Sequence, residues 1–261
     1  MAAVYIGGVI SFDKYYDPDL LLAIISAGAI AGFGNVVNDV YDIELDRQSK
    51  PHRVLPSGML KSHEAIVWAM VLAACGIIVA GLINNLCLML ASAAAILLLA
   101  YTPALKGNRY WGNLLVAFVG SLAFFYGAAA IGNEIGGLIP AVYALLFHFA
   151  REIVKDIEDL EHDKNANLNT GAVRYGEKNS RMLAVIVLVI LFFATYIPYM
   201  LGIYKIGYLI TVVVGTDIFL LFFIIRLLGA PTANTCGFIS GFMKAIMPLG
   251  ILAVFLGSRG L

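Results

Sequence analysis

One spacing of three aspartates occurs twice in this chain and constrains the fold more than any other feature. Both copies read D-x-x-D-x-x-x-D and lie 117 positions apart: Asp39, Asp42 and Asp46, then Asp156, Asp159 and Asp163. Because an α-helix has about 3.6 residues per turn, positions i, i+3 and i+7 fall on one helix face. Apolar positions repeat in the same register, so the duplication is structural as well as chemical. Two such helices predict one shared site.

The remainder of the chain is mostly apolar. It is 61% hydrophobic and 13% charged, with a mean hydropathy of +0.89, whereas about a quarter of the residues in soluble domains are charged. Eight apolar segments approach or exceed the ~20 residues that a membrane-crossing helix needs: 18–46, 63–83, 84–105, 110–133, 137–163, 179–201, 204–228 and 237–258.

The stretch 1–12 adds a ninth apolar segment, which we interpret as most of a first helix whose N-terminal start is truncated. No Pro-, Gly- or Ser-rich linker divides the chain. The sequence therefore predicts an all-α fold, a polytopic membrane helical bundle of about nine transmembrane helices, formed by a single domain over residues 1–261.

Basic residues are sorted between the two sides of the predicted bundle. The opposite loops hold only Lys14 and Lys205, while alternate loops hold Arg47, Lys50, Arg53, Lys61, Lys106, Arg109, Lys164, Arg174, Lys178, Arg181 and Arg226. The positive-inside rule places the basic side in the cytoplasm, which predicts a multi-pass protein of the cell membrane. Both aspartate copies lie at this cytoplasmic end. A nucleic-acid partner is not expected.

The duplicated carboxylates predict a metal site. Six carboxylates that converge at a low-dielectric boundary need cations to remain ionised. Oxygen ligands select hard divalent ions, and Mg²⁺ typically binds through one or two carboxylates and bridges to substrate phosphates. The candidate metal ligands are the six aspartates and Asn38, which precedes Asp42 by four residues. A solvated helix end is the alternative for either copy alone, but the repeat in one register favours a ligand site.

A basic loop follows each aspartate copy. Lys50 and Arg53 follow the first copy, and Lys164 follows the second. Such loops suit a diphosphate, because metal ions and basic side chains can share its charge. The alternative for any one of these residues is that it only keeps its loop on the cytoplasmic side of the membrane.

These motifs resemble the UbiA superfamily of intramembrane prenyltransferases over nearly the whole chain. The resemblance rests on Asn38-x-x-x-Asp42-x-x-x-Asp46, Asp159-x-x-x-Asp163 and Lys50-Pro-x-Arg53-x-x-Pro56-Ser-Gly58. Within the superfamily, Tyr101-Thr-Pro-Ala-Leu-Lys106 and Arg151-Glu-Ile-Val-Lys155-Asp156-Ile-Glu-Asp159 look most like archaeal geranylgeranylglyceryl-phosphate geranylgeranyltransferases. Arg53-Val-Leu-Pro56 departs mildly from the common Arg-Pro-Leu-Pro order.

The resemblance implies that the two aspartate-bearing helices face a central cavity. It also implies Mg²⁺-dependent transfer of a geranylgeranyl group from geranylgeranyl diphosphate to the hydroxyl of geranylgeranylglyceryl phosphate, in archaeal ether-lipid synthesis. The aspartates would be catalytic by holding two Mg²⁺ ions on the diphosphate. Further diphosphate partners implied by the matching motifs, besides Asn38, Lys50, Arg53 and Lys164, are Lys106, Arg151 and Lys155. The partners are thus a prenyl diphosphate, a lipid or aromatic acceptor, and the bilayer.

Aromatic faces can stabilise the allylic cation that ionisation of the diphosphate leaves behind. Tyr101 and Tyr126 are the candidates for this role. Two further polar residues lie inside predicted spans. We interpret His148 as a hydrogen-bonded packing residue, whereas Asp217 either has a functional role or pairs with a neighbouring helix.

Two other functions remain open at this point. A UbiA-type polyprenyltransferase acting on 4-hydroxybenzoate or naphthoate, in quinone synthesis, would use the same diphosphate site with another acceptor. A cation transporter could also carry paired acidic helices. Transporter sites favour the bilayer midplane, whereas both aspartate copies here lie at one membrane end, so the enzyme is favoured.

Overall fold

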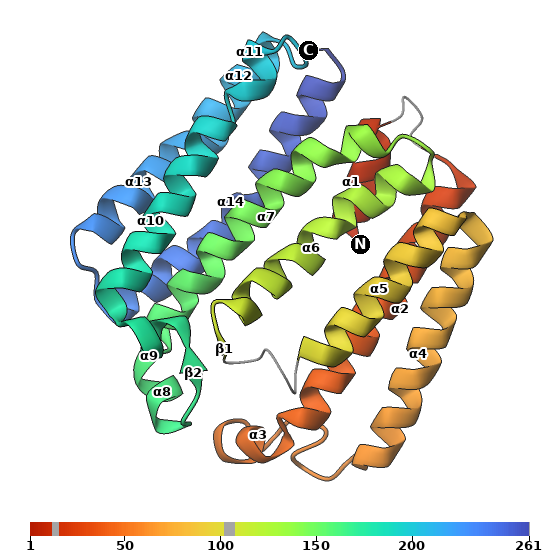
Figure 1. Cartoon of the computed structure of the whole chain (residues 1–261), viewed down its shortest axis with the longest axis vertical. Helices are drawn as coiled ribbons and strands as arrows, with labels where there is room; N and C mark the ends of the chain where they lie inside the picture. The colour runs from red at the N-terminus through yellow and green to blue at the C-terminus, as the bar shows by residue number, and fades with distance from the viewer. Residues whose placement is uncertain (12–15, 102–107, 261) are drawn as a thin grey trace.

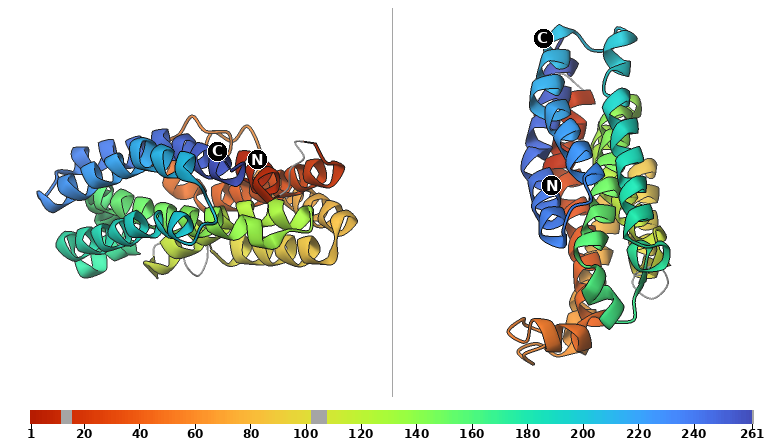
Figure 2. Two further views of the ribbon diagram at one scale, coloured as in Figure 1. Left: turned by 90° about the horizontal axis from the view of Figure 1, so that it is seen from above. Right: turned by 90° about the vertical axis from the view of Figure 1, so that its left-hand side faces the viewer.

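A computed structural model describes residues 1–11, 16–101 and 108–260 of the chain. Figure 1 shows a bundle of helices that run roughly along one long axis. Figure 2 shows these helices in two layers, with the first and last helices of the chain in one and its central helices in the other. The helices are α1 (Ala2–Ser11), α2 (Pro18–Tyr41), α3 (Ile43–Ser49), α4 (Ser62–Ile83), α5 (Asn85–Ala100), α6 (Trp111–Ala130), α7 (Glu134–Glu158), α8 (Leu160–Asn165), α9 (Gly171–Tyr175), α10 (Glu177–Ala194), α11 (Ile197–Met200), α12 (Ile206–Val212), the π-helix η2 (Val213–Asp217), α13 (Ile218–Leu228) and α14 (Ala233–Ser258).

Two short strands lie at the end of the bundle that carries α8. β1 (Asn108–Arg109) and β2 (Asn169–Thr170) pair in parallel, with Asn108 opposite Asn169. Just beyond them, the ring of Tyr110 stacks on Tyr175, with the ring centroids 5.5 Å apart. The Tyr110 hydroxyl also lies 2.8 Å from the Ser180 hydroxyl. These contacts fix the loop that follows α8 against the start of α6.

The predicted membrane bundle is confirmed. Within the described ranges, seven helical stretches are long and apolar enough to cross a bilayer: Pro18–Tyr41, Ser62–Ile83, Trp111–Ala130, Glu134–Glu158, Glu177–Met200, Ile206–Leu228 and Ala233–Ser258. Two shorter apolar helices, α1 and α5, accompany them. Large apolar side chains such as Trp68, Met70 and Ile96 are exposed, as a lipid-facing surface requires. The count of nine spanning helices stays a prediction.

Each aspartate copy is divided between two helices, where the sequence predicts one continuous helix. Asp42 separates α2 from α3 with φ −84° and ψ 1°, and Asp159 separates α7 from α8 with φ −87° and ψ 6°. Helical bonding then resumes, because the Asp46 N–H donates to the Asp42 carbonyl at 2.8 Å and the Asp163 N–H donates to the Asp159 carbonyl at 2.9 Å. The internal repeat therefore includes a kink at the middle aspartate of both copies.

Glycines let α1 and α6 approach closely. A Cβ added to Gly7 would lie 2.0 Å from the Phe124 carbonyl oxygen, and one added to Gly127 would lie 1.9 Å from the Val4 carbonyl oxygen. Small residues at such crossings allow backbone contact between membrane helices. The contact places the start of α1 beside α6, next to the interior of the bundle.

We expect Gly127→Val to destabilise the protein by about 1–3 kcal/mol, because the added side chain forces α1 and α6 apart. The measurement is the unfolding transition of the purified protein in detergent. Gly241→Val on α14 is the matched control, since nothing lies within 4 Å of a Cβ added there. Equal stability of the two variants would contradict the close approach of the helices.

Candidate active site

The first aspartate copy is held by Arg53. The Asp46 carboxylate is only 5% exposed and accepts a hydrogen bond of 2.8 Å from Nη1 of Arg53. The same nitrogen lies 3.6 Å from Oδ1 of Asp39. Asn38 donates to Oδ2 of Asp42 at 2.9 Å. The loop after α3 thus folds back so that one guanidinium neutralises the first and third aspartates, while the middle one accepts from an amide.

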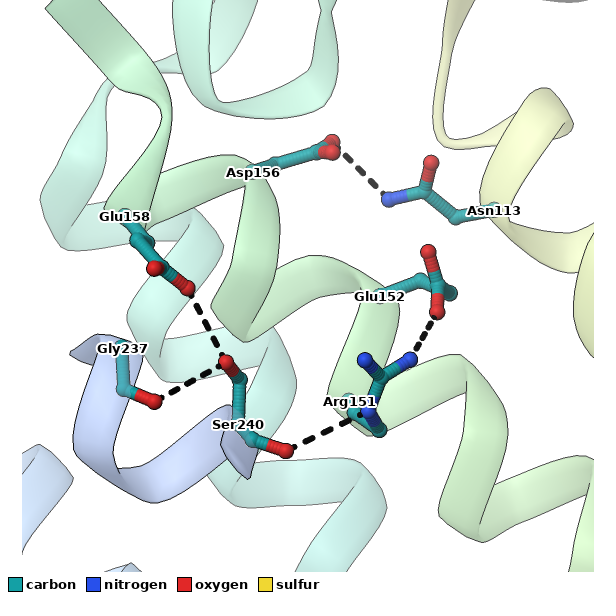
Figure 3. Close-up of polar contacts among 7 residues, drawn as sticks. All are labelled: Asn113, Arg151, Glu152, Asp156, Glu158, Gly237 and Ser240. Atoms are coloured by element: carbon teal, nitrogen blue, oxygen red, sulfur yellow. Dashed lines mark hydrogen bonds and ion pairs between the residues drawn. The ribbon is translucent and has the colours of Figure 1, made fainter. Parts of the chain in front are cut away.

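The second aspartate copy faces α6. Asn113 on α6 donates to Oδ2 of Asp156 at 2.9 Å, as Figure 3 shows. Asp163 is only 7% exposed, and burial raises the pKa of its carboxyl above the ordinary value, with the nearby Asp159 charge acting in the same direction. A cation near Asp163 would oppose this shift by favouring its ionised form.

Arg151 and Glu158 face α14 rather than the aspartates. The Ser240 hydroxyl donates to Oε2 of Glu158 at 2.9 Å, and Nε of Arg151 donates to the Ser240 carbonyl at 3.3 Å. The Arg151 guanidinium also pairs with Glu152. These bonds join α7 to α14. They give Arg151 a structural position, and its predicted contact with a diphosphate stays a prediction.

Tyr101 links the two aspartate copies electrostatically. It is half-buried at the end of α5, where burial and then the carboxylates of Glu152, Asp156 and Asp42 raise its pKa to about 12. Glu152 and Asp156 belong to α7 and Asp42 lies at the junction of α2 and α3, so carboxylates of both copies act on the Tyr101 phenol. Figure 1 shows α3 and α8 at the same end of the bundle. The shared end that the sequence predicts is therefore present.

The other predicted site residues lie in varied surroundings. Tyr126 is buried, and its hydroxyl lies 2.7 Å from the Ser26 hydroxyl in the packing of α2 against α6, so no described contact joins it to the aspartates. Lys164 is exposed and donates to Glu161 at 2.7 Å. Lys106 lies outside the described residues. The remaining two predicted diphosphate ligands are exposed: Lys50 and Lys155.

Two residues near the site were not predicted from the sequence. Glu152 precedes Asp156 by four residues, so helical spacing alone could have placed it on the same face. Asn113 gave no such signal, because its bond to Asp156 depends on how α6 packs against α7. Figure 3 shows Asp156 and Glu152 on the side of α7 toward Asn113.

The donor chemistry of the site fits Mg²⁺. Over residues 1–11, 16–101 and 108–260, no group of three or more His, Cys, Asp or Glu side chains lies close enough to hold a metal ion. Four of the six aspartates instead contact Arg53, Asn38 or Asn113. The available ligands are nevertheless all oxygen atoms. One or two carboxylates, with water and phosphate oxygens, are a usual Mg²⁺ set.

An apolar cavity of about 370 Å³ lies deeper in the bundle. α1, α6, α7, α10, α12, η2 and α14 line it, and its polar lining residues are Tyr143, His148, Thr195 and Thr216. The aspartates, which the resemblance placed facing a central cavity, are not among its lining residues. The cavity reaches His148, about one helical turn from Glu152 on α7.

Asp217, one of the intramembrane polar residues, pairs with a neighbouring helix. It is 1% exposed, and its two oxygens lie 3.3 and 3.2 Å from the Thr195 hydroxyl. Tyr208 in turn donates to the Thr195 carbonyl at 2.6 Å. Of the two interpretations of Asp217, the structure supports a pairing role.

Comparisons with known proteins agree with this architecture. The model of the UbiA prenyltransferase family matches residues 1–246. The digeranylgeranylglyceryl phosphate synthase of Methanococcus aeolicus is 35% identical over 239 residues, which cover 92% of this chain and 85% of the relative. The enzyme of the same name from Sulfolobus acidocaldarius is 37% identical over 224 residues, covering 85% of this chain and 81% of the relative.

Solved structures share the fold. One of a digeranylgeranylglyceryl phosphate synthase superposes with a TM-score of 0.88 at 33% identity and covers 100% of this chain and 93% of that chain. A UbiA homologue from Archaeoglobus fulgidus bound to GPP and Mg²⁺ superposes with a TM-score of 0.73 at 17% identity, covering 98% and 93%. Fold, site and relatives define a multi-pass membrane prenyltransferase. The chain belongs to the UbiA prenyltransferase family, as its motifs predicted.

We expect Arg53→Gln to lower the free energy of unfolding by about 1 kcal/mol in the absence of divalent ions, because Asp46 loses a charged hydrogen-bond partner that is itself partly exposed. Arg47→Gln is the matched control, because Arg47 pairs with Glu44 where both side chains are exposed. Denaturation in detergent with a chelator measures both. A control variant that loses more stability than Arg53→Gln would refute this account of Asp46.

Proposed function

We propose that the protein transfers a geranylgeranyl group from geranylgeranyl diphosphate to the hydroxyl of geranylgeranylglyceryl phosphate, with Mg²⁺ as cofactor, in the synthesis of archaeal ether lipids. The observation that carries this proposal is the duplicated, kinked aspartate helix, whose two copies lie at one end of the bundle (Figure 1). The names of the relatives support the choice of substrates.

Each aspartate copy supplies ligands to the metal site. Asn38, Asp39, Asp42 and Asp46 belong to the first set, and Asp156, Asp159 and Asp163 belong to the second. Bound Mg²⁺ would neutralise the diphosphate and so stabilise it as a leaving group. The contacts of Arg53 with Asp46 and Asp39 support a role for its guanidinium in binding a phosphate oxygen beside the first set.

The rest of the site orients the prenyl chain and excludes water. The apolar cavity beyond His148 suits an isoprenoid chain, because its lining is mainly aliphatic and aromatic. Tyr101 presents an aromatic ring near both carboxylate sets, where its face can stabilise an allylic cation. Apolar walls around the reacting carbon favour attack by the acceptor hydroxyl over attack by water.

The site faces the cytoplasm in this proposal, and the protein lies in the cell membrane. The support is the distribution of Lys and Arg, because Lys50 and Arg53 follow α3 while Lys164 in α8 and Arg174 in α9 follow the second aspartate copy. A water-soluble diphosphate head could then reach the site from the cytoplasm, while both isoprenoid chains stay in the bilayer.

The test incubates purified protein with radiolabelled geranylgeranyl diphosphate, Mg²⁺ and either geranylgeranylglyceryl phosphate or 4-hydroxybenzoate. We expect product with the glycerol lipid, no product in EDTA, and recovery when Mg²⁺ is restored. Product with 4-hydroxybenzoate alone would refute the lipid acceptor. Metal flux into liposomes without any prenyl transfer would refute the enzyme class.

We expect Asp42→Ala and Asp159→Ala each to lower transfer by at least about 100-fold, because each removes a ligand that stabilises the leaving diphosphate. Their unfolding transitions in detergent should stay close to that of the unaltered protein, since both side chains are only partly buried. Glu44→Ala and Glu161→Ala are the matched controls, because both are exposed carboxylates beside the same two copies. Full turnover in either aspartate variant would overturn the metal assignment.

A further inference from the structure

One face of α7 connects the aspartate site to the cavity. His148, Glu152 and Asp156 follow one another at four-residue intervals on this continuous helix, so their side chains share a face. The neighbouring helix α6 meets the same face at two points. Asn113 donates to Asp156, and a Cβ on Gly120 would lie 3.8 Å from Cδ2 of His148. We call these five residues the α6–α7 seam.

His148 lies where the α6–α7 seam opens into the cavity. His148 lines the cavity, and a Cβ added at Gly120 would lie 4.0 Å from Nε2 of its ring. Among the described residues, no hydrogen bond to the His148 ring is found, and the ring packs edge-on against Phe147 with the centroids 6.4 Å apart, so a packing contact is present and the expected hydrogen bond stays a prediction. Tyr143, a further polar residue of the cavity wall, donates its hydroxyl proton to the Ala194 carbonyl at 2.9 Å. His148 therefore offers the cavity a base whose ring nitrogens have no described protein partner.

His148 lies on α7 between the aspartate end of the helix and the apolar cavity. Asp156 and His148 are eight residues apart on α7, or roughly 12 Å along the helix axis. Asp156 would help to hold a metal-bound diphosphate at its end of this face, and the ion would supply charge that stabilises the leaving group. The first prenyl carbon joins this polar head to the apolar chain. With the head at the aspartates and the chain in the cavity, this carbon would lie where the polar seam meets the apolar cavity, beside His148.

We propose that His148 is the catalytic base that takes the proton from the acceptor hydroxyl, an inference that rests on the proposed function. The bond between the first prenyl carbon and the diphosphate oxygen breaks, and its electron pair leaves with the diphosphate. A lone pair of the acceptor hydroxyl oxygen forms the new ether bond to that carbon. The hydroxyl proton moves to an unprotonated ring nitrogen of His148, and the imidazolium then releases it to water or to the departing diphosphate.

Neighbouring groups are less suited to this step. Glu152 is already paired with the Arg151 guanidinium. The Tyr101 phenol, with a pKa of about 12, carries its own proton at neutral pH. Asp156 lies about two helical turns nearer the aspartate end of α7 and bonds to Asn113. Of these four residues, His148 is therefore the one best suited to accept a proton at the mouth of the cavity.

The experiment compares His148→Gln with the unaltered protein in two measurements. Glutamine can still form hydrogen bonds but cannot act as a base at neutral pH. We expect kcat for transfer to geranylgeranylglyceryl phosphate to fall by at least about 100-fold, while the Kd for geranylgeranyl thiolodiphosphate with Mg²⁺ stays within about threefold, because a general base acts on the chemical step and not on donor binding. His63→Gln, the same change on an exposed histidine of α4, is the matched control and should alter neither value.

Three outcomes would overturn the proposal. A kcat for His148→Gln within about threefold of the unaltered protein would show that no base is needed at this position. Equal loss of donor binding and transfer would assign His148 to donor positioning or to folding. An equal loss of kcat in His63→Gln would show that the effect is not specific. By contrast, absence of transfer in the unaltered protein would refute the proposed function itself, so the two failures are distinguishable.

Discussion

The structure depends on how the negative charges of carboxylates are balanced by hydrogen-bond donors and basic side chains at the edge of a hydrocarbon layer. Ionised groups there are costly unless a charge or a hydrogen-bond donor accompanies them. Asp46 has Arg53, and Asp156 has Asn113. Each partner comes from a different element than its aspartate, so these pairs also hold the loop after α3 and the start of α6 in place. The polar end of the bundle is organised around these contacts.

The pairs are of a kind that a metal ion can replace. Asn113 is a neutral donor, and the Arg53 side chain is 44% exposed, so neither partner is locked into the interior. A divalent ion offers a carboxylate more charge than an amide does, and a phosphate oxygen offers Arg53 an alternative acceptor. A metal ion would therefore replace the present partners of the aspartates, and a diphosphate would replace the aspartates as partners of Arg53.

The sequence predicted the helices well and the directions of side chains less well. Hydropathy identifies the spans, and Asp17 caps α2 as its position before Pro18 suggests, with the Asp19 N–H donating to its side chain at 2.9 Å. The kink at Asp42 could not be predicted, because the aspartate spacing fits an unbroken helix equally well. The direction of Arg151 depends on Ser240 in α14, a contact between segments 89 residues apart that no local pattern encodes. Tertiary packing decides such features.

The contacts of the α6–α7 seam depend on the number of residues between them in each of the two helices. A helix turns by about 100° and rises about 1.5 Å for each residue. One residue inserted between His148 and Asp156 would rotate one of these side chains away from α6 while the other kept its place. A single-residue deletion in α6 between Asn113 and Gly120 would have the same effect from the opposite wall. Indels in this stretch are therefore far more disruptive than indels in the loops, although every side chain named here could be retained.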